Sequence, residues 1–309
     1  MHMTTLPAIA SGQQYDIGVR NDRASVVEVG AGLRSYVAHG RELLDGHAAD
    51  EMATSGRGQV LVPWPNRLRD GRYRWDGEEH QVPINEPAKG NAIHGLVRFL
   101  SWTCLLHTST RVDLGCLLRP RPGYPFTLEV TMSYRISATG LTVVTTARNA
   151  GAEALPYAFG QHPYLSLGGG LIDDGTLEAP GATYLPTDDR GIPTGVSSVD
   201  GTAYDFRTAR PLGSAEIDYA FTDLSRDSSG KAWVRLHHPD GAGTAVWVDE
   251  SCPYVELFTG DTLPADRRRR GLGVEPMTAP PNAFGSGKEI HRIEPDDSVT
   301  TSWGIQALD

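Results

Sequence analysis

Two histidines and one glutamate stand in short segments rich in glycine, proline and aromatic residues. His94 lies in GNAIHGLVRF and His162 in AFGQHPYLSL. Glu275 precedes Pro276 in GLGVEPMTAPPNAF, which is predicted to be a loop stiffened by its prolines. An imidazole with an ordinary pKa of about 6.5 exchanges protons near neutral pH, and a carboxylate held on a rigid segment is a natural base. These three side chains therefore have the chemistry of a general acid–base site.

A second set of residues has the chemistry to hold a sugar ring. Arg67 follows Trp64 and Asn66 in VPWPNRLRDG, Asp218 precedes a tyrosine in EIDYAF, and Tyr164 stands in HPYLSL. Arginine presents a planar fork of donors that suits hydroxyl groups or anions, and flat aromatic faces suit the C–H faces of a pyranose. We expect these five residues to contact the substrate.

Each of these residues also has an ordinary structural explanation when it is taken alone. A buried histidine is usually a hydrogen-bonded core group, Asp218 could cap a turn, and Arg67 could pair with a surface carboxylate. His94, His162 and Glu275 could in principle bind zinc through two imidazoles and a carboxylate, but their spacings match no compact zinc motif. We therefore expect no metal.

Known cofactor and nucleophile motifs are missing from the sequence. It contains no GxxxxGK[ST], no GxGxxG after a strand, no HExxH and no GxSxG. Nucleotide-dependent and zinc-protease chemistry therefore fit poorly, and we expect an enzyme that works without a cofactor.

The composition limits the partners of the chain. Its 309 residues include 28 Lys+Arg and 38 Asp+Glu, for a net charge of −10, which argues against nucleic acid and anionic membranes as partners. No apolar run approaches the ~18 residues of a membrane-spanning helix, and the N-terminus lacks a secretory signal pattern. The three cysteines match no metal motif, so we expect buried thiols in the cytoplasm. We expect a monomer or homodimer.

The elements that must position these residues are predicted to be strands. Residues 126–136 alternate between apolar and polar side chains over eleven positions, which indicates a strand with one buried face. A turn and the β-branched segment 141–149 follow, so this pair is predicted to form a long hairpin. Two more hairpins are expected around Asp76-Gly77 and Asp240-Gly241.

The rest of the chain also favours strands. Further candidates are residues 25–29, 111–118, 254–259 and 298–306, whereas helical patterns are limited to single turns near 41–44 and 264–268. The 35 glycines and 21 prolines indicate many turns, and residues 85–96 and 165–193 are expected to be long loops. We predict one all-β domain over residues 1–309, a large antiparallel β-sandwich, with residues 1–15 as a flexible N-terminal segment.

Five segments in order resemble the aldose 1-epimerases, or galactose mutarotases. They are PNRLRDGRYRWDG, the HG of NAIHGL, HPYL, IDYAF and VEPMTAPPNAF, which together span residues 66–284. The resemblance implies the galactose mutarotase-like supersandwich and a cofactor-independent isomerase that acts on a monosaccharide, a hexose. It also implies that Arg67 and Asp218 bind the substrate, that His94 and His162 are active-site histidines, and that Glu275 is catalytic.

The sequence also departs from the family pattern. In HPYLSL, Leu165 and Ser166 depart from the usual pattern of the family. In PYVELFTG, Glu256 and Leu257 stand where the family commonly has glutamine and a second polar residue. HGLVR is similar to a segment of the hexose-6-phosphate mutarotase branch. A phosphorylated or sulfonated hexose, a non-catalytic sugar-binding protein, and a glycoside hydrolase or lyase therefore remain open alternatives, although hydrolysis normally needs two flanking carboxylates.

Opening a cyclic hemiacetal requires a base and an acid on the two oxygens of C1. We expect Glu275 to take the proton of the C1 hydroxyl and His162 to protonate the ring oxygen, with His94 orienting His162 or sharing its role. In this scheme Glu275 is ionised and His162 is protonated before the reaction starts. Arg67 and Asp218 would hold the remaining hydroxyls.

Overall fold

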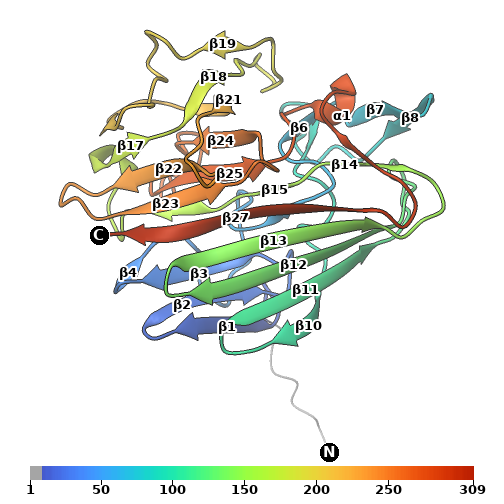
Figure 1. Ribbon diagram of the computed structural model, residues 1–309. Helices are drawn as coiled ribbons and strands as arrows, with labels where there is room; N and C mark the ends of the chain where they lie inside the picture. Colours follow the sequence, from blue (N-terminus) through green and yellow to red (C-terminus); the bar gives the residue numbers. More distant parts are fainter. Residues whose placement is uncertain (1–8) are drawn as a thin grey trace, which may run out of the picture.

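The computed structural model describes residues 9–309 and consists almost entirely of antiparallel strands (Figure 1). The longest strands lie side by side in a nine-stranded sheet. In spatial order this sheet contains β10 (Thr103–His107), β11 (Arg111–Leu118), β12 (Leu128–Ser137), β13 (Gly140–Asn149), β27 (Ser298–Leu308), β23 (Gly243–Val248), β22 (Ala232–His237), β17 (Thr176–Glu178) and β20 (Arg210–Pro211).

A second, eight-stranded sheet lies against the first. Its order is β19 (Ser197–Ser198), β18 (Gly181–Tyr184), β21 (Asp218–Leu224), β24 (Tyr254–Phe258), β25 (Gly271–Met277), β15 (Gly160–Gln161) and β5 (Val60–Leu61), and β16 (Tyr164–Ser166) pairs with β25 beside this path. Apolar side chains from both sheets, such as Val143, Trp303, Leu257 and Val274, belong to one buried core.

Smaller sheets complete the molecule. β1 (Gln14–Val19), β2 (Asp22–Val27), β3 (Leu33–Ala38) and β4 (Arg41–Glu42) form a four-stranded sheet that contacts β11 and β12 (Figure 1). Three two-stranded ladders pair β14 (Leu155–Tyr157) with β26 (His291–Ile293), β6 (Arg67–Arg69) with β9 (Asn91–Ile93), and β7 (Arg72–Trp75) with β8 (Glu78–Gln81).

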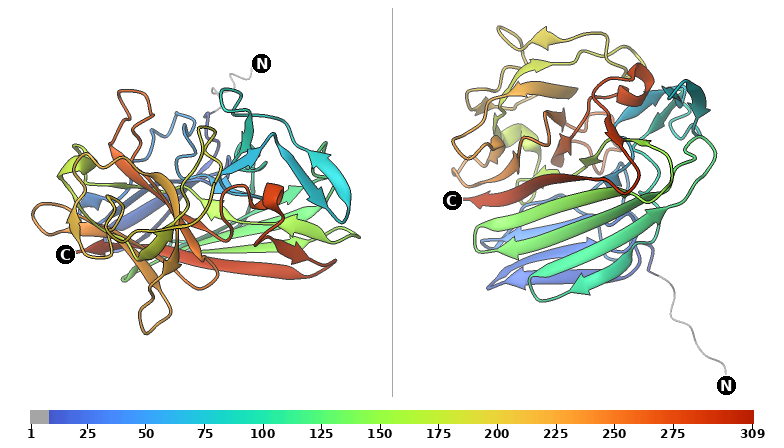
Figure 2. Two further views of the ribbon diagram at one scale, coloured as in Figure 1. Left: turned by 90° about the horizontal axis from the view of Figure 1, so that it is seen from above. Right: turned by 45° about the vertical axis from the view of Figure 1, so that its right-hand side comes forward.

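The described residues contain only two short helices. They are the short 3-10 helix η1 (Ile172–Asp174) and the single-turn α1 (Ala283–Ser286), which packs beside β6 and β7 (Figure 2). Within residues 9–309, no helix is long and apolar enough to cross a membrane.

The strands predicted from alternation and turn chemistry are confirmed. β12 and β13 form the long hairpin, with Leu128, Val130 and Met132 fully buried on one face. The Asp76-Gly77 turn joins β7 to β8, and the Asp240-Gly241 turn lies between β22 and β23. The predicted all-β antiparallel sandwich is therefore confirmed.

Other expectations are wrong in detail. The turn expected near 41–44 contains β4, which pairs with the end of β3, and the loop expected over 165–193 contains β17 and β18. These strands have two to four residues, too few for a period of two to be visible in sequence. The expected flexible segment, residues 1–15, falls mostly on residues 1–8, which lie outside the described residues, and β1 begins at Gln14.

Candidate active site

Glu275 stands on β25, in the middle of the eight-stranded sheet, and not in the loop that the sequence indicated. The prediction was wrong because Pro276 follows it, and proline disfavours central strands. The strands beside β25 explain the exception: β16 pairs with Gly271 to Gly273 and β15 pairs with Met277, so the ladder is interrupted between them, next to Pro276. Val274 faces the core, so by alternation Glu275 faces the opposite side of the sheet.

His162 occupies this interruption between β15 and β16. The backbone N–H of Val274 donates to the carbonyl of Pro163, which anchors the irregular segment to β25. Nε2 of His162 lies 3.0 Å from Oε1 of Glu275, and both side chains are buried. The break in the ladder thus places the imidazole directly beside the carboxyl group.

The His162 ring is held in place from behind. It stacks on Tyr164, with centroids 4.6 Å apart and planes 8° from parallel, and the hydroxyl of Tyr164 donates to the carbonyl of Ser55. The guanidinium of Arg57 also lies over the Tyr164 ring, 4.3 Å from its centroid. Gly56 lies so close that a Cβ there would sit 2.7 Å from Cδ2 of His162. The imidazole therefore has little freedom to tilt.

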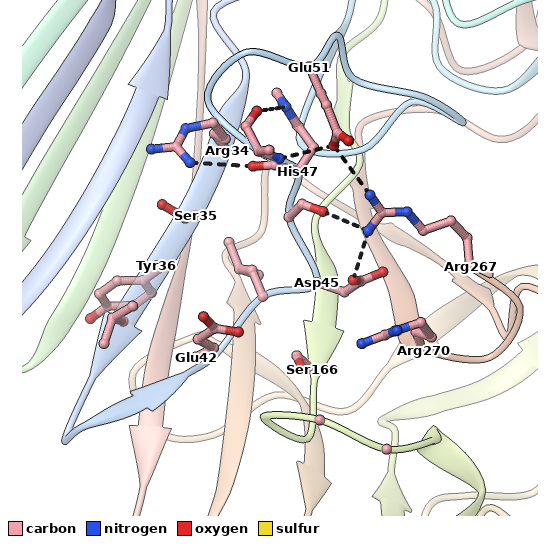
Figure 3. Close-up of a pocket in the computed structure, with 16 residues that line it drawn as sticks. Arg34, Ser35, Tyr36, Glu42, Asp45, His47, Glu51, Ser166, Arg267 and Arg270 are labelled. Atoms are coloured by element: carbon pink, nitrogen blue, oxygen red, sulfur yellow. Dashed lines mark hydrogen bonds and ion pairs between the residues drawn. The ribbon is translucent and has the colours of Figure 1, made fainter.

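Asp45, the partner of Arg57, also lines a hollow of about 430 Å³ on the surface of the protein (Figure 3). One oxygen of Asp45 pairs with Arg57 at 2.8 Å, and the other lies 3.6 Å from Arg267. Glu51 also pairs with Arg267, at 3.4 Å (Figure 3). Asp45 and Glu51 are thus paired with arginines. Through Arg57, these ion pairs help to hold the Tyr164 ring on which His162 stacks.

His94 and Asn66 join the two strands of the β6–β9 ladder at one end. The backbone N–H of His94 donates to the carbonyl of Asn66 at 3.0 Å, and the backbone N–H of Asn66 donates to Nδ1 of His94 at 3.1 Å. Since Nδ1 accepts a hydrogen bond, a neutral His94 carries its proton on Nε2. The His94 ring lies edge-on to His162, with centroids 5.4 Å apart.

Arg67 is the first residue of β6 and is oriented by two carboxylates. Its Nε donates to both oxygens of Glu86 at 3.1 Å, and its Nη1 lies 3.6 Å from Asp218 at the start of β21. Burial alone would lower the pKa of Arg67, but the charges of Asp218 and Glu86 outweigh it and raise that pKa. The guanidinium therefore stays charged.

These side chains meet in one cleft of about 330 Å³. Of the residues predicted from sequence, seven line it: Asn66, Arg67, His94, His162, Tyr164, Asp218 and Glu275. Trp64 does not line it, because its ring is buried in the core 5.6 Å from Phe284. From sequence alone, an aromatic residue in a proline-rich turn that packs in the core cannot be told from one that stacks on a sugar.

Sequence reasoning missed other residues at or beside this cleft. Glu86, Arg98 and Phe258 line it, and Glu256, which the sequence marked only as a departure from the family pattern, lies next to Glu275 on the neighbouring strand. HGLVR had drawn attention to the Arg98 segment, but Glu86 stands in an expected loop with no motif. Arg98 lines the cleft without a salt bridge among the described residues, and burial lowers its pKa to about 10.

Burial controls the protonation of the catalytic candidates. It raises the pKa of Glu275 to about 8, helped by the charge of Asp218, and it lowers the pKa of His162 to about 3, helped by Arg57. These pKa values favour a carboxylic acid beside a neutral imidazole. This pair contains the same single proton as the expected carboxylate and imidazolium, so the two forms differ only in where that proton sits.

The same three groups could offer ligand atoms to a metal. One atom each from His94, His162 and Glu275 lie within 4.8 Å of one another. However, Nδ1 of His94 already accepts a hydrogen bond from Asn66, and Nε2 of His162 is engaged by Glu275. An ion would have to displace the contact between His162 and Glu275, so acid–base chemistry fits this arrangement better.

The chain is similar in sequence to known proteins. A family model described as aldose 1-epimerase matches residues 15–305. The uncharacterized protein YihR of Escherichia coli (strain K12) is 35% identical over 286 residues, covering 92% of this chain and 90% of that protein. Galactose mutarotase of Homo sapiens is 29% identical over 234 residues, covering 71% of this chain and 66% of that protein.

The fold is also found among solved structures. That of galactose 1-epimerase from Lactobacillus acidophilus NCFM superposes with a TM-score of 0.79 at 19% identity, and the match covers 96% of this chain and 98% of that one. This likeness concerns the fold, whereas the match to the family model extends over nearly the whole sequence. The chain belongs to the aldose 1-epimerase family.

Proposed function

We propose that this protein is a mutarotase that interconverts the α and β anomers of a hexose by opening and reclosing the sugar ring. The observation that carries the proposal is the 3.0 Å contact between His162 Nε2 and Glu275 Oε1, buried in a cleft that suits a single monosaccharide. A mere sugar-binding protein would not need an acid and an imidazole that share one proton in this position.

The chemistry requires two proton transfers. When the sugar enters, the proton shared by the pair moves from Glu275 to His162. The carboxylate of Glu275 then takes the proton of the C1 hydroxyl, and the imidazolium of His162 gives its proton to the ring oxygen. The bond between C1 and the ring oxygen breaks, its electron pair goes to that oxygen, and C1 becomes an aldehyde. Rotation about C1–C2 and the reverse transfers close the other anomer, so each residue acts once as acid and once as base.

The remaining residues hold the ring and the developing charge. His94 offers Nε2–H as a neutral donor, because burial and the nearby charge of Arg98 lower its pKa well below the usual range. Arg67 and Asp218 stand at one side of the cleft and would bind hydroxyl groups, with Asn66 beside them. Tyr164 lines the cleft and supports His162.

A hexose with an anionic substituent is a second candidate substrate, and Arg98 favours it. This guanidinium lines the cleft, and no carboxylate among the described residues pairs with it. Within residues 9–309, Arg98 is half-buried and donates only to the carbonyl of Ile93, so its charge is not compensated by a carboxylate, and a phosphate or sulfonate on the sugar would provide that counter-charge.

We also propose that the chain works as one domain, as a monomer or homodimer, in the cytoplasm. Cys104, Cys116 and Cys252 are all free thiols in the structure, which supports a reducing compartment.

Polarimetry on freshly dissolved α-glucose and α-galactose, with and without protein, tests the proposal. Wild-type protein is expected to speed the approach to equilibrium, and Glu275→Gln and His162→Asn each to slow it by about 10²–10⁴-fold. Parallel runs with glucose 6-phosphate and a sulfonated glucose compare the substrates, and preference for an anionic sugar should disappear in Arg98→Met. Identical curves with and without protein for all four sugars would rule out the proposal.

A further inference from the structure

A second buried glutamate, Glu256, lies beside the proposed base. It stands on β24 directly opposite Glu275 of β25 in the antiparallel register. Side chains opposite each other on adjacent strands have Cβ atoms about 4.5–5.5 Å apart and point to the same side of the sheet. Both residues are only 2% exposed. The mechanism proposed above gives Glu256 no role.

The surroundings of Glu256 disfavour a second negative charge. Glu275 faces it from β25, Asp218 from the start of β21, and Arg67 from β6, while the side-chain amide of Asn66 lies near it and lowers its pKa. Arg67 is already bound by Glu86 and lies 3.6 Å from Asp218, so its charge is largely compensated.

The other side of Glu256 is apolar. Tyr254 on its own strand, with Ala220 and Met277 on the two flanking strands, belongs to a small buried apolar cluster. Two carboxyl groups this close, next to apolar side chains, cannot both be ionised cheaply, so one of them keeps a proton.

The unpaired atoms show where that proton is needed. Oε2 of Glu256 and Oε2 of Glu275 are both buried, and neither has a hydrogen-bond partner among the described residues. Oε1 of Glu275 faces His162, so its Oε2 is free for a group on another side. A hydroxyl on Glu256 would satisfy both orphaned oxygens with one hydrogen bond, because one would donate and the other accept.

We propose that Glu256 is a positioning residue: a neutral carboxylic acid whose O–H donates to Glu275 and stabilises Glu275 as the ionised base of the loaded site. The role rests on the proposed function, because it acts through Glu275. Glu256 itself transfers no proton to the sugar. The proton of Glu256 stays on Glu256 through the cycle, and Glu275 remains free to exchange its own with the C1 hydroxyl.

The electrostatics also favour a protonated Glu256. Burial, then the charges of Asp218 and Glu275, raise the pKa of Glu256 well above its usual range, while Arg67 and Asn66 lower it. For Glu275, burial and Asp218 raise the pKa to about 8, and Arg67 lowers it. Burial and Asp218 thus favour a protonated carboxyl group at both positions, and the charge of an ionised Glu275 further favours the proton on Glu256.

Two substitutions separate a neutral donor from the other roles that Glu256 could have. Glu256→Gln keeps a neutral side chain of the same shape with an N–H donor, and it is expected to keep kcat/KM within about threefold and the alkaline limb of the pH profile in place. Glu256→Leu fills the space without a donor. It is expected to lose about 10- to 100-fold in kcat/KM and to move the alkaline limb upward, because the ionised form of Glu275 loses a hydrogen bond.

Each other result overturns the proposal. If Glu256→Gln loses as much activity as Glu275→Gln, Glu256 works as a carboxylate. If the Gln and Leu variants have the same activity and the same pH profile, Glu256 only fills space. If the Leu variant does not fold, as measured by its thermal transition, the Gln variant and the infrared measurement below decide.

An infrared measurement on the folded protein needs no activity and so distinguishes failure of this proposal from failure of the proposed function. Difference spectra of wild type against Glu256→Gln and against Glu275→Gln, taken over a pH series, assign the C=O stretch of a protonated carboxylic acid to each residue. We expect the Glu256 band to be present at pH 7 and to persist to higher pH than the Glu275 band. Absence of the Glu256 band at pH 7 would show an ionised Glu256 and overturn the proposal, even in an active mutarotase.

Discussion

Asn66 and His94 hold each other through two reciprocal contacts. The backbone N–H of Asn66 donates to Nδ1 of His94, and the backbone N–H of His94 donates to the carbonyl of Asn66. Both residues adopt left-handed backbone conformations, with φ of 53° and 62°, which let the chain turn at the ends of β6 and β9. The ring is thus fixed with Nε2 as its free nitrogen.

This geometry makes His94 a neutral hydrogen-bond donor. His94→Ala removes the donor and is expected to lower kcat/KM by about 10²–10³-fold, as for other donors to developing charge. His94→Gln keeps an N–H donor and should lose clearly less, which steady-state anomerisation rates would measure. Equal losses in the two variants would contradict the donor role.

Gly56 leaves the space that His162 needs. Gly56→Ala places a Cβ 2.7 Å from Cδ2 of His162, so we expect the imidazole to shift and kcat to fall by about 10²-fold, the typical cost of a misplacement near 1 Å.

The control for this substitution is Gly40→Ala. Gly40 has the same φ, +75°, but a Cβ there meets nothing within 4 Å. Both variants should lose similar stability from the backbone strain, and only Gly56→Ala should lose activity. A normal kcat in a folded Gly56→Ala protein would show that the position of His162 is not critical.

The pair of Glu275 and His162 should set the pH range of activity. With pKa values of about 8 and about 3, the pair holds one proton between these limits. Above the upper limit it loses that proton and cannot protonate the ring oxygen, so kcat/KM is expected to fall about tenfold per pH unit. A pH–rate profile corrected for the uncatalysed reaction measures this, and a rate that keeps rising to pH 10 would contradict it.

Glu275 should also make the folded protein less stable at alkaline pH. Its folded pKa of about 8 lies above the ordinary value of 4.5, so its contribution is complete at low pH and is lost as pH rises through 8. His162, with a lowered pKa, acts in the opposite direction only below about 6.5, so Glu275 can be measured between pH 6.5 and 8.5.

Glu275→Gln removes this dependence. Relative to wild type, the variant is expected to gain about 1–2 kcal/mol in free energy of unfolding between pH 6.5 and 8.5, measured by denaturant titration. Glu216→Gln is the control, because Glu216 is exposed and should show no such gain. A constant difference between Glu275→Gln and wild type across this range would contradict the raised pKa.

The sequence allowed the fold to be predicted where periodicity was long enough to see. Residues 126–149 alternate over whole strands around one turn, so β12 and β13 were predictable, whereas β17 and β18 are too short to show a pattern. At Glu275, strand pairing outweighed the local preference for a loop that Pro276 indicated. Pro276 is tolerated in β25 because the ladder beside it is interrupted there.

The candidate site was only partly predictable. Seven of its residues followed from the types of side chain and the resemblance to a family, but nothing in the spacing placed His162 against Glu275. Arg57 and Glu256 act through partners distant in sequence, namely Tyr164 and Glu275, and such contacts leave no local signal.

A double-mutant cycle on Glu275 and His162 tests the central claim that the two side chains share one proton and act as a unit. Glu275→Gln and His162→Asn are each expected to lose about 10²–10⁴-fold in kcat/KM. The double variant should lose no more than about tenfold beyond the worse single variant, because either change already disables the pair. Losses that multiply in the double variant, or a single variant with full activity, would contradict the claim.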